Sequence, residues 1–209
     1  MKRYAFTMLE LVFVIIVIGI LAVLAMPSFN SNQLEQAAEQ VASHIRYTQH
    51  LAMTDDKYDP TDATWYRERW QIRFRRLMSE NGYVIFSDSV NTQRNADNAE
   101  IAIDPLSGER MNGFDRWDVG NLSASYGILG TNVGVVQSCF TADGSLVTAN
   151  AGVFAFDHLG RPYSGVSNAG TTTQYRMVSD CNLTLTDNTG QRAIITVRAD
   201  TGYVSVFYP

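Results

Sequence analysis

A long apolar run near the amino terminus limits what the rest of this chain can fold into. The residues from Phe6 to Glu10 pass directly into an apolar stretch that ends at Met26, and Glu10 is the one charged residue within it. As a helix, the roughly 21 residues of this run measure about 31 Å at about 1.5 Å per residue, which matches the hydrocarbon core of a bilayer. We therefore expect residues 6–26 to form a helix that crosses a membrane.

The flanks of the run predict its direction. Lys2 and Arg3 precede it, and positive charge beside a first apolar segment keeps that end in the cytoplasm. The chain after Pro27 is therefore expected on the outer side of the membrane. A carboxylate in lipid is costly unless it is paired, and no basic side chain lies within the run. The best cation for Glu10 is an amino terminus.

These features together resemble the class III signal of type IV pilins and type II secretion pseudopilins. The signal combines a basic leader, a small residue, an aromatic residue, Glu10 and an uninterrupted apolar run. The resemblance implies that a membrane prepilin peptidase cuts between Ala5 and Phe6 and methylates Phe6, which makes residues 1–5 the leader. Glu10 becomes the fifth mature residue, which this family pairs with the terminal amine of a neighbouring subunit. The family usually has glycine before the cut, and Ala5 is small enough that we expect processing.

Two simpler interpretations of the run stay open. An ordinary secretory signal has an apolar region of about 7 to 15 residues followed by a cleavage site of small residues. Here the run is longer and ends at Met26 and Pro27 without such a site. A plain membrane anchor does not need Glu10. The combination of residues favours the pilin-like interpretation.

Composition excludes some functions. Without Lys2 and Arg3 the chain has 14 basic and 21 acidic residues and a net charge of -7. This balance argues against a protein that coats nucleic acid over its whole surface. The sequence contains no P-loop, GxSxG, HExxH or dinucleotide-binding fingerprint, so we do not expect an enzyme.

Residues 27–53 are predicted to form an amphipathic continuation of the helix. Apolar residues recur there at helical spacing, namely Leu34, Ala38, Val41, Ile45 and Ala52. Asn32 and Glu35 are spaced like a capping pair, which would start a fresh helix. Alternatively, one helix runs through and is kinked at Pro27. Pilins resemble the second case, with the first half of the helix in the filament core and the second half on the globular domain.

Residues 54–209 are predicted to form a globular, β-rich domain. Trp70, Ile72 and Phe74 alternate with polar residues, and a turn over residues 79–82 leads into a second strand over 83–86, which predicts a hairpin. Further strands are predicted at 101–103, 123–129, 135–140, 153–156, 183–186, 193–198 and 203–208. The expected fold class is α+β, with the long helix packed on an antiparallel β-sheet or β-sandwich.

Two segments of this domain indicate a narrower group within the pilin-like family. Residues 156–162 and the terminal strand pair joined by residues 200–204 look like those of the GspH/FimT-type minor pilins and pseudopilins, whereas residues 88–134 resemble no known segment. The resemblance implies a single-pass protein of the bacterial inner membrane with its carboxy-terminal domain in the periplasm. It implies a structural subunit of a type II secretion pseudopilus or type IV pilus, with other pilins, the prepilin peptidase and the inner-membrane assembly platform as partners. The alternatives are a fibre-tip module for DNA uptake or adhesion, and an anchored β-sandwich without a fibre.

One basic, aromatic cluster stands out in this acidic chain. Arg67, Arg69, Arg73 and Arg75 share one face if the strand begins early. Arginine binds phosphate and aromatic rings stack on bases, so the cluster is a candidate DNA contact. The interpretation that we favour is a solvated strand face, or a contact with the acidic surface of a neighbouring subunit.

Cysteines and acidic residues suggest two further sites. A disulfide between Cys139 and Cys181 would persist outside the cytoplasm, and two free buried thiols are the alternative. Some pseudopilins bind calcium through a loop, so the resemblance makes the acidic residues Asp104, Glu109, Asp115 and Asp118 candidate ligands, with solvated surface carboxylates as the alternative. His44, His50 and His158 have no metal-site spacing. We therefore predict no metal or other cofactor.

Overall fold

The computed structural model describes residues 7–24, 33–77, 80–89, 96–113, 119–128, 130–132 and 152–209. The chain divides into two compact units, Met1–Gln33 and Leu34–Pro209. The predicted cleavage site at Ala5 and Phe6 and the predicted kink at Pro27 lie outside the described residues.

The first unit contains helix α1, Met8–Leu24. The helix begins after Thr7, whose carbonyl oxygen accepts hydrogen bonds from the backbone N–H groups of Glu10 and Leu11 at 3.1 and 3.2 Å. The hydroxyl of Thr7 also accepts from the Glu10 N–H, so Thr7 acts as an N-cap. Within the described residues, no helix combines the length and the apolar character needed to cross a membrane.

The second unit is built on helix α2, Gln33–Thr54. A broad face of α2 is buried, comprising Leu34, Ala37, Ala38, Val41, Ala42, His44, Ile45, Thr48 and Ala52. Four of these residues are alanines, whose small side chains let neighbouring layers come close to the helix axis. The predicted amphipathic helix is confirmed over residues 33–53. The segment 25–32 between the helices is not described, so the choice between a fresh start and a kinked continuation stays open.

One antiparallel sheet has the strand order β2-β1-β4-β5. Its strands are β1 (Gln71–Leu77), β2 (Glu80–Phe86), β4 (Val153–Phe156) and β5 (Pro162–Tyr163). Ile72 and Phe74 are fully buried, as the alternation predicts. The predicted turn over residues 79–82 is wrong, because Leu77 already pairs with Glu80 and the next two residues belong to β2.

Tertiary contacts explain this misplaced turn. The side-chain amide of Asn81 donates a hydrogen bond to the carbonyl oxygen of Ile128 at 3.0 Å. A Cβ atom at Gly82 would lie 2.7 Å from the carbonyl oxygen of Gly113. Asn81 and Gly82 therefore lie within a strand that another part of the backbone approaches closely. Glycine in a strand often marks such a close approach.

The second antiparallel sheet has the order β3-β6-β7-β8. Its strands are β3 (Gly130–Asn132), β6 (Cys181–Thr186), β7 (Arg192–Val197) and β8 (Val204–Phe207). Burial alternates along β6 and β7, as expected for a sheet that is covered on one face. The strands predicted at 183–186, 193–198 and 203–208 are confirmed to within two residues.

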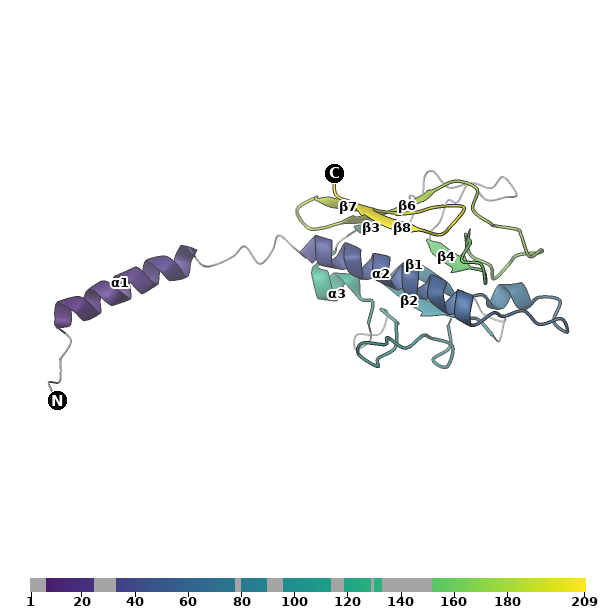
Figure 1. Cartoon of the computed structure of the whole chain (residues 1–209), viewed down its shortest axis with the longest axis horizontal. Helices are drawn as coiled ribbons and strands as arrows, with labels where there is room; N and C mark the ends of the chain where they lie inside the picture. Colours follow the sequence, from purple (N-terminus) through teal and green to yellow (C-terminus); the bar gives the residue numbers. More distant parts are fainter. Residues whose placement is uncertain are drawn as a thin grey trace. The chain divides into compact units, whose positions relative to one another are not determined.

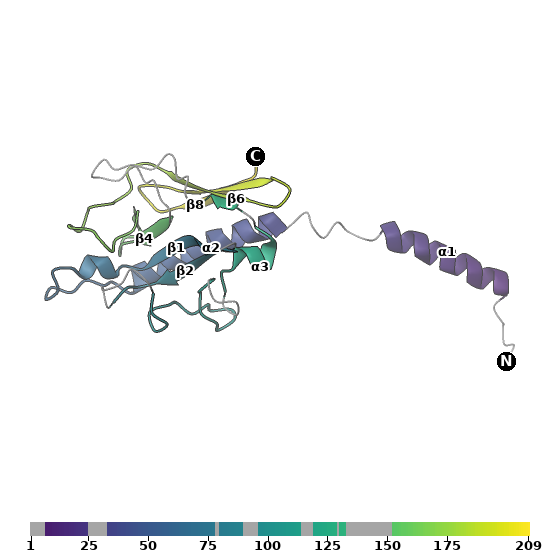
Figure 2. The ribbon, with the colours of Figure 1, turned by 180° about the vertical axis from the view of Figure 1, so that it is seen from behind.

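Both sheets and α2 share one hydrophobic core, in which Ile45, Phe74 and Leu183 are fully buried. In Figures 1 and 2, α2 runs alongside the strands of both sheets. The structure is thus α+β with antiparallel sheets, as predicted at the level of fold class. The short helix η1, Trp65–Glu68, precedes β1.

In the middle of the chain, the structure differs from the predicted strands. The strand predicted at 123–129 is wrong, because residues Leu122–Tyr126 form helix α3. The backbone N–H of Ser125 donates to the Asn121 carbonyl oxygen, which closes this single turn. Residues 101–103 form only isolated bridges, from Ile101 to Phe86 and from Ile103 to Arg110. The strand predicted at 135–140 lies outside the described residues.

Candidate functional site

Helix α1 presents apolar side chains to solvent on every side. Val17 is half-buried, the exposed fractions of the other large apolar residues from Met8 to Leu21 run from 42 % at Val14 to 88 % at Met8, and none of these residues is buried. Exposed apolar area of this extent marks a surface that a partner covers. Glu10 lies in the first turn and is the one ionisable residue of α1. Its side chain is exposed and free to pair with a partner's charge.

The four arginines of the basic cluster do not share a strand face. Strand β1 begins at Gln71, so Arg67 and Arg69 precede it. The Nε atom of Arg67 donates to the Ala169 carbonyl oxygen at 2.9 Å, and Nη1 of Arg69 donates to that of Thr172 at 3.0 Å. Both arginines therefore fasten the segment after β5 to the start of the first sheet, and the predicted common face is wrong.

Arg69 is an interior residue with an exposed fraction of 6 %. Its guanidinium lies 4.4 Å from the ring centre of Tyr163 and 5.3 Å from that of Trp65. Burial lowers the pKa of Arg69, and the Tyr163 and Asp157 side chains partly offset that effect. Arg73 lies over the ring of Phe86 at 4.8 Å. The side chain of Arg75 is outside the described part of the chain, so DNA or subunit contact at this cluster stays a prediction.

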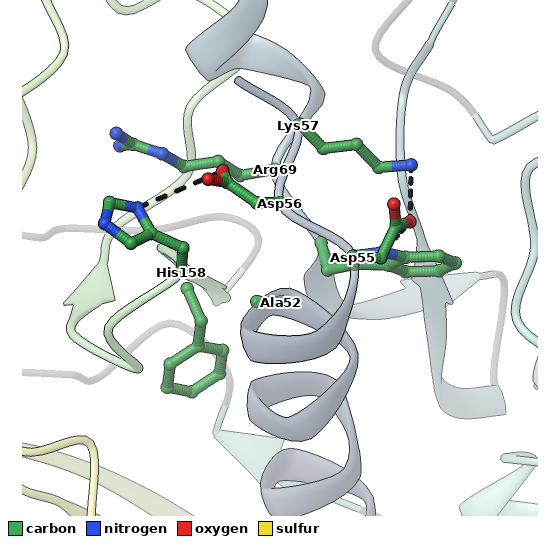
Figure 3. A pocket seen from close by; sticks show the side chains of 8 residues that line it. Ala52, Asp55, Asp56, Lys57, Arg69 and His158 are labelled. Atoms are coloured by element: carbon green, nitrogen blue, oxygen red, sulfur yellow. Dashed lines mark hydrogen bonds and ion pairs between the residues drawn. The ribbon is translucent and has the colours of Figure 1, made fainter.

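A shallow pocket opens where α2 ends (Figure 3). It encloses about 180 Å³, including space open to solvent, and is lined by Ala52, Asp55, Asp56, Lys57, Arg69, Trp70, Phe156 and His158. Lys57 Nζ lies 2.6 Å from Asp55 Oδ2, and Trp70 Nε1 donates to the same oxygen at 2.8 Å. Burial would raise the pKa of Asp55, but these hydrogen bonds outweigh it and lower the pKa. Nδ1 of His158 lies 4.0 Å from Asp56 Oδ1, and the acidic side chains of the pocket therefore face basic ones within the same lining.

Gln49 joins two turns at this end of α2. Its Nε2 donates at 2.8 Å both to the Gly160 carbonyl oxygen, between β4 and β5, and to the Thr201 carbonyl oxygen, between β7 and β8. A Cβ atom at Gly202 would lie 2.4 Å from the Gly160 oxygen, so the two turns touch. The segments 156–162 and 200–204, which carry part of the sequence resemblance, therefore meet on α2.

A buried carboxylate shapes the first of these turns. Asp157 is 2 % exposed and accepts hydrogen bonds from the backbone N–H groups of Leu159 and Arg161 at 3.0 and 2.9 Å. The guanidinium of Arg161 pairs with it at 2.8 Å, and this hydrogen bond raises the pKa of Arg161. Sequence reasoning did not single out Asp157 or Gln49. The Asp-x-x-Gly pattern at 157–160 was the available signal for a turn held by its own aspartate.

A polar group of side chains lies inside the core between α2 and β2. The Nδ1 atom of His44 is 2.6 Å from the hydroxyl of Tyr83, which also accepts a hydrogen bond from Gln40 Nε2 at 3.1 Å. Tyr126 donates in turn to Gln40 Oε1. Burial lowers the pKa of His44, and the Asp104 carboxylate partly offsets this. His44 thus belongs to a hydrogen-bonded polar group inside the core.

The remaining predicted sites are only partly described. Cys181 begins β6 and is disulfide-bonded, while its predicted partner Cys139 lies outside the described residues. Of the acidic residues considered for calcium, Asp115 and Asp118 also lie outside them. Asp104 caps its own turn, accepting hydrogen bonds from Leu106 N–H and the Ser107 hydroxyl. No group of three potential metal ligands occurs in the part of the chain that is described.

Comparison with known proteins adds no relative, since no family model, no curated protein and no solved structure matches the chain.

Proposed function

We propose that this chain is a structural subunit of a fibre, of the minor pseudopilin or minor pilin kind. The observation that carries the proposal is α1, a helix with apolar side chains exposed on all sides and one carboxylate in its first turn. Like helices packed side by side would cover this surface, because removing apolar area from water is favourable. Before assembly, the segment 6–26 would be held in the inner membrane, with the globular unit in the periplasm.

Glu10 has a defined part in this mechanism. A carboxylate that becomes covered among apolar helices is costly unless a cation pairs with it. The described part of α1 contains no basic side chain. The proposed cation is the methylated amine of Phe6 from a neighbouring subunit, cut from the leader at Ala5. This pair would set the axial register between subunits.

The test replaces Glu10 in the full chain expressed with its assembly machinery. Glu10→Ala should insert in the membrane at the normal level but fail to enter sheared fibres. The matched control is Glu109→Ala, which removes an exposed glutamate from the globular unit and should leave incorporation unchanged. Normal incorporation of Glu10→Ala would contradict the pairing mechanism, whereas a parent chain that enters no fibre would favour a simple membrane-anchored domain.

A further inference from the structure

The sheet of β3, β6, β7 and β8 has one covered face and one exposed face. Odd-numbered residues of β6 and β7, such as Leu183 and Ile195, are fully buried in the core that the sheet shares with α2. Successive side chains of a strand point to opposite faces, so the even-numbered residues of β6 and β7 point away from the core. They define the outer face of this sheet, which lies as a layer on one side of α2 (Figures 1 and 2).

Two aromatic side chains stand on the outer face. Ser205 and Phe207 of β8 pair directly with Thr196 and Ile194 of β7, and paired residues of an antiparallel sheet share a face. Tyr203 precedes Ser205 by two positions and therefore lies on the same side. The exposed fractions are 63 % at Tyr203 and 61 % at Phe207. The two rings are four positions apart, which is about 13 Å along the strand.

The rest of the outer face carries half-buried, polar side chains without charge. The hydroxyl of Thr196 donates to Oδ1 of Asn182 at 2.8 Å. This bond leaves the side-chain N–H groups of Asn182 without a partner among the described residues. Hydroxyl and amide groups together can both donate and accept hydrogen bonds. The hydroxyl and amide residues of this face are Asn182, Thr184, Thr186, Thr196 and Ser205.

Charged residues lie only at the two ends of this surface. Arg198 pairs with Asp180 at one end, and Arg192 begins β7 at the other. Between these ends, the outer residues of β6, β7 and β8 are all uncharged. A nucleic acid or an anionic membrane requires a broad positive surface, so the outer face suits a neutral partner.

We propose that the outer face binds a neutral, extended polysaccharide. A sugar ring presents C–H groups on its flat sides, which pack on exposed aromatic rings, and hydroxyls at its edge, which exchange hydrogen bonds with hydroxyl and amide side chains. Tyr203 and Phe207 hold two sugars of one chain, and Ser205 and Thr196 contact the stretch between them. A solvated sheet face is normally polar throughout, and the two rings set this face apart.

The inference goes beyond the proposed fibre function and does not depend on assembly, because it concerns the globular unit alone. The test uses the full chain in mild detergent with two insoluble neutral polysaccharides, chitin and cellulose. Each is mixed with the protein and sedimented, and the depletion of the supernatant gives the dissociation constant. The parent chain should bind at least one of them, and added salt should not weaken binding, because salt screens only charges. Failure to bind either, or binding that salt abolishes, would overturn the proposal.

Variants of the two rings locate the site. Tyr203→Ala and Phe207→Ala should each raise the dissociation constant several-fold, and the combined variant should raise it further, whereas Tyr203→Phe keeps the ring and should bind like the parent. The matched control is Tyr58→Ala, which removes a tyrosine of similar exposure, 61 %, from the loop after α2 and should leave binding unchanged. All these variants should keep the parent's melting temperature, since the side chains are exposed. Undiminished binding by the combined variant would contradict the proposal.

A protein partner is the other occupant that exposed aromatic residues indicate. If the combined variant enters sheared fibres less than the parent, while the parent binds neither polysaccharide, the outer face is a subunit contact and the proposal is wrong. Glu10→Ala should bind polysaccharide like the parent chain. A loss of incorporation by Glu10→Ala therefore leaves the polysaccharide site standing, and a lack of polysaccharide binding leaves the fibre function standing.

Discussion

The two long helices of this chain differ in how far their apolar side chains are buried. In α2, a broad face is buried by both sheets, and residues such as Val41 and Ile45 have no exposed surface. In α1, the isoleucines at positions 15, 16, 18 and 20 are between 54 and 60 % exposed. Helix α2 has its packing partners within its own unit, whereas the described residues of the first unit provide none for α1.

This difference indicates what each helix is for. An amphipathic helix gains its stability from packing its apolar face on the rest of the fold. A helix that is apolar all round has no face suited to water and requires lipid or other helices. The packing of the globular unit can therefore be explained from its own residues, whereas α1 needs lipid or other helices to cover its apolar side chains.

The largest effect is expected when isoleucine is replaced by alanine in each helix, which tests the difference in burial between α2 and α1. Ile45→Ala should lower the free energy of unfolding of the globular unit by about 2–5 kcal/mol, because it leaves a cavity in the core. Ile16→Ala, at a site 54 % exposed, should change it by less than about 0.5 kcal/mol. Urea unfolding of the chain in mild detergent, followed by near-UV circular dichroism, measures both. Equal losses would mean that α1 also packs on the globular unit.

A pair of glycines tests how tightly α2 is held at its end. Gly202 has φ +66 and touches the Gly160 carbonyl oxygen, whereas Gly190 has φ +86 and nothing close to its Cβ position. Gly202→Ala combines backbone strain with overpacking and should cost about 2–4 kcal/mol. Gly190→Ala has the backbone strain alone and should cost about 1 kcal/mol. The same unfolding measurement applies, and equal costs would show that the two turns do not meet on Gln49.

The smallest effect concerns pH. Burial holds the pKa of His44 below its ordinary value, so folding favours the neutral imidazole. As pH falls below about 6.5, the unfolded chain binds a proton that the folded chain does not, and stability declines until the folded pKa is passed. The melting temperature should therefore fall between about pH 8 and about pH 5.5, the range in which histidine titrates.

His44→Asn is the variant that isolates this contribution. Its side-chain amide replaces Nδ1 as the hydrogen-bond partner of the Tyr83 hydroxyl, and it does not titrate. The fall in melting temperature across the same pH range should be smaller than in the parent chain. An unchanged pH dependence would exclude His44 as its source.

Sequence patterns predicted the regular parts of the fold. The 3.6-residue period located α2 and alternation located β1, because burial on one side leaves a periodic pattern of apolar residues, and β6 and β7 lie within two residues of the strands predicted at 183–186 and 193–198. The turn at 79–82 and the strand at 123–129 were misplaced. At Asn81 and Gly82 the contacts come from residues distant in sequence, and these override local turn preference.

At the candidate sites, too, the sequence revealed local properties but not contacts between residues that are distant in sequence. The sequence located helix α1, since length and apolarity are local properties, and the assembly role of Glu10 stays a prediction. It did not reveal that Arg67 and Arg69 are used to fasten a loop, because their acceptors lie about a hundred positions further along the chain. The turn contacts of Gln49 were hidden for the same reason, as they depend on how two sheets meet on one helix.

The most direct test of the fibre-subunit account is the amino terminus of the mature protein. Edman sequencing and intact mass of the chain from cells that contain prepilin peptidase should show a start at Phe6 with a methylated amine. That terminus would place Glu10 at the fifth position, ready to pair with a neighbouring subunit. A chain that still begins at Met1, or one cut after the apolar run, would contradict the account.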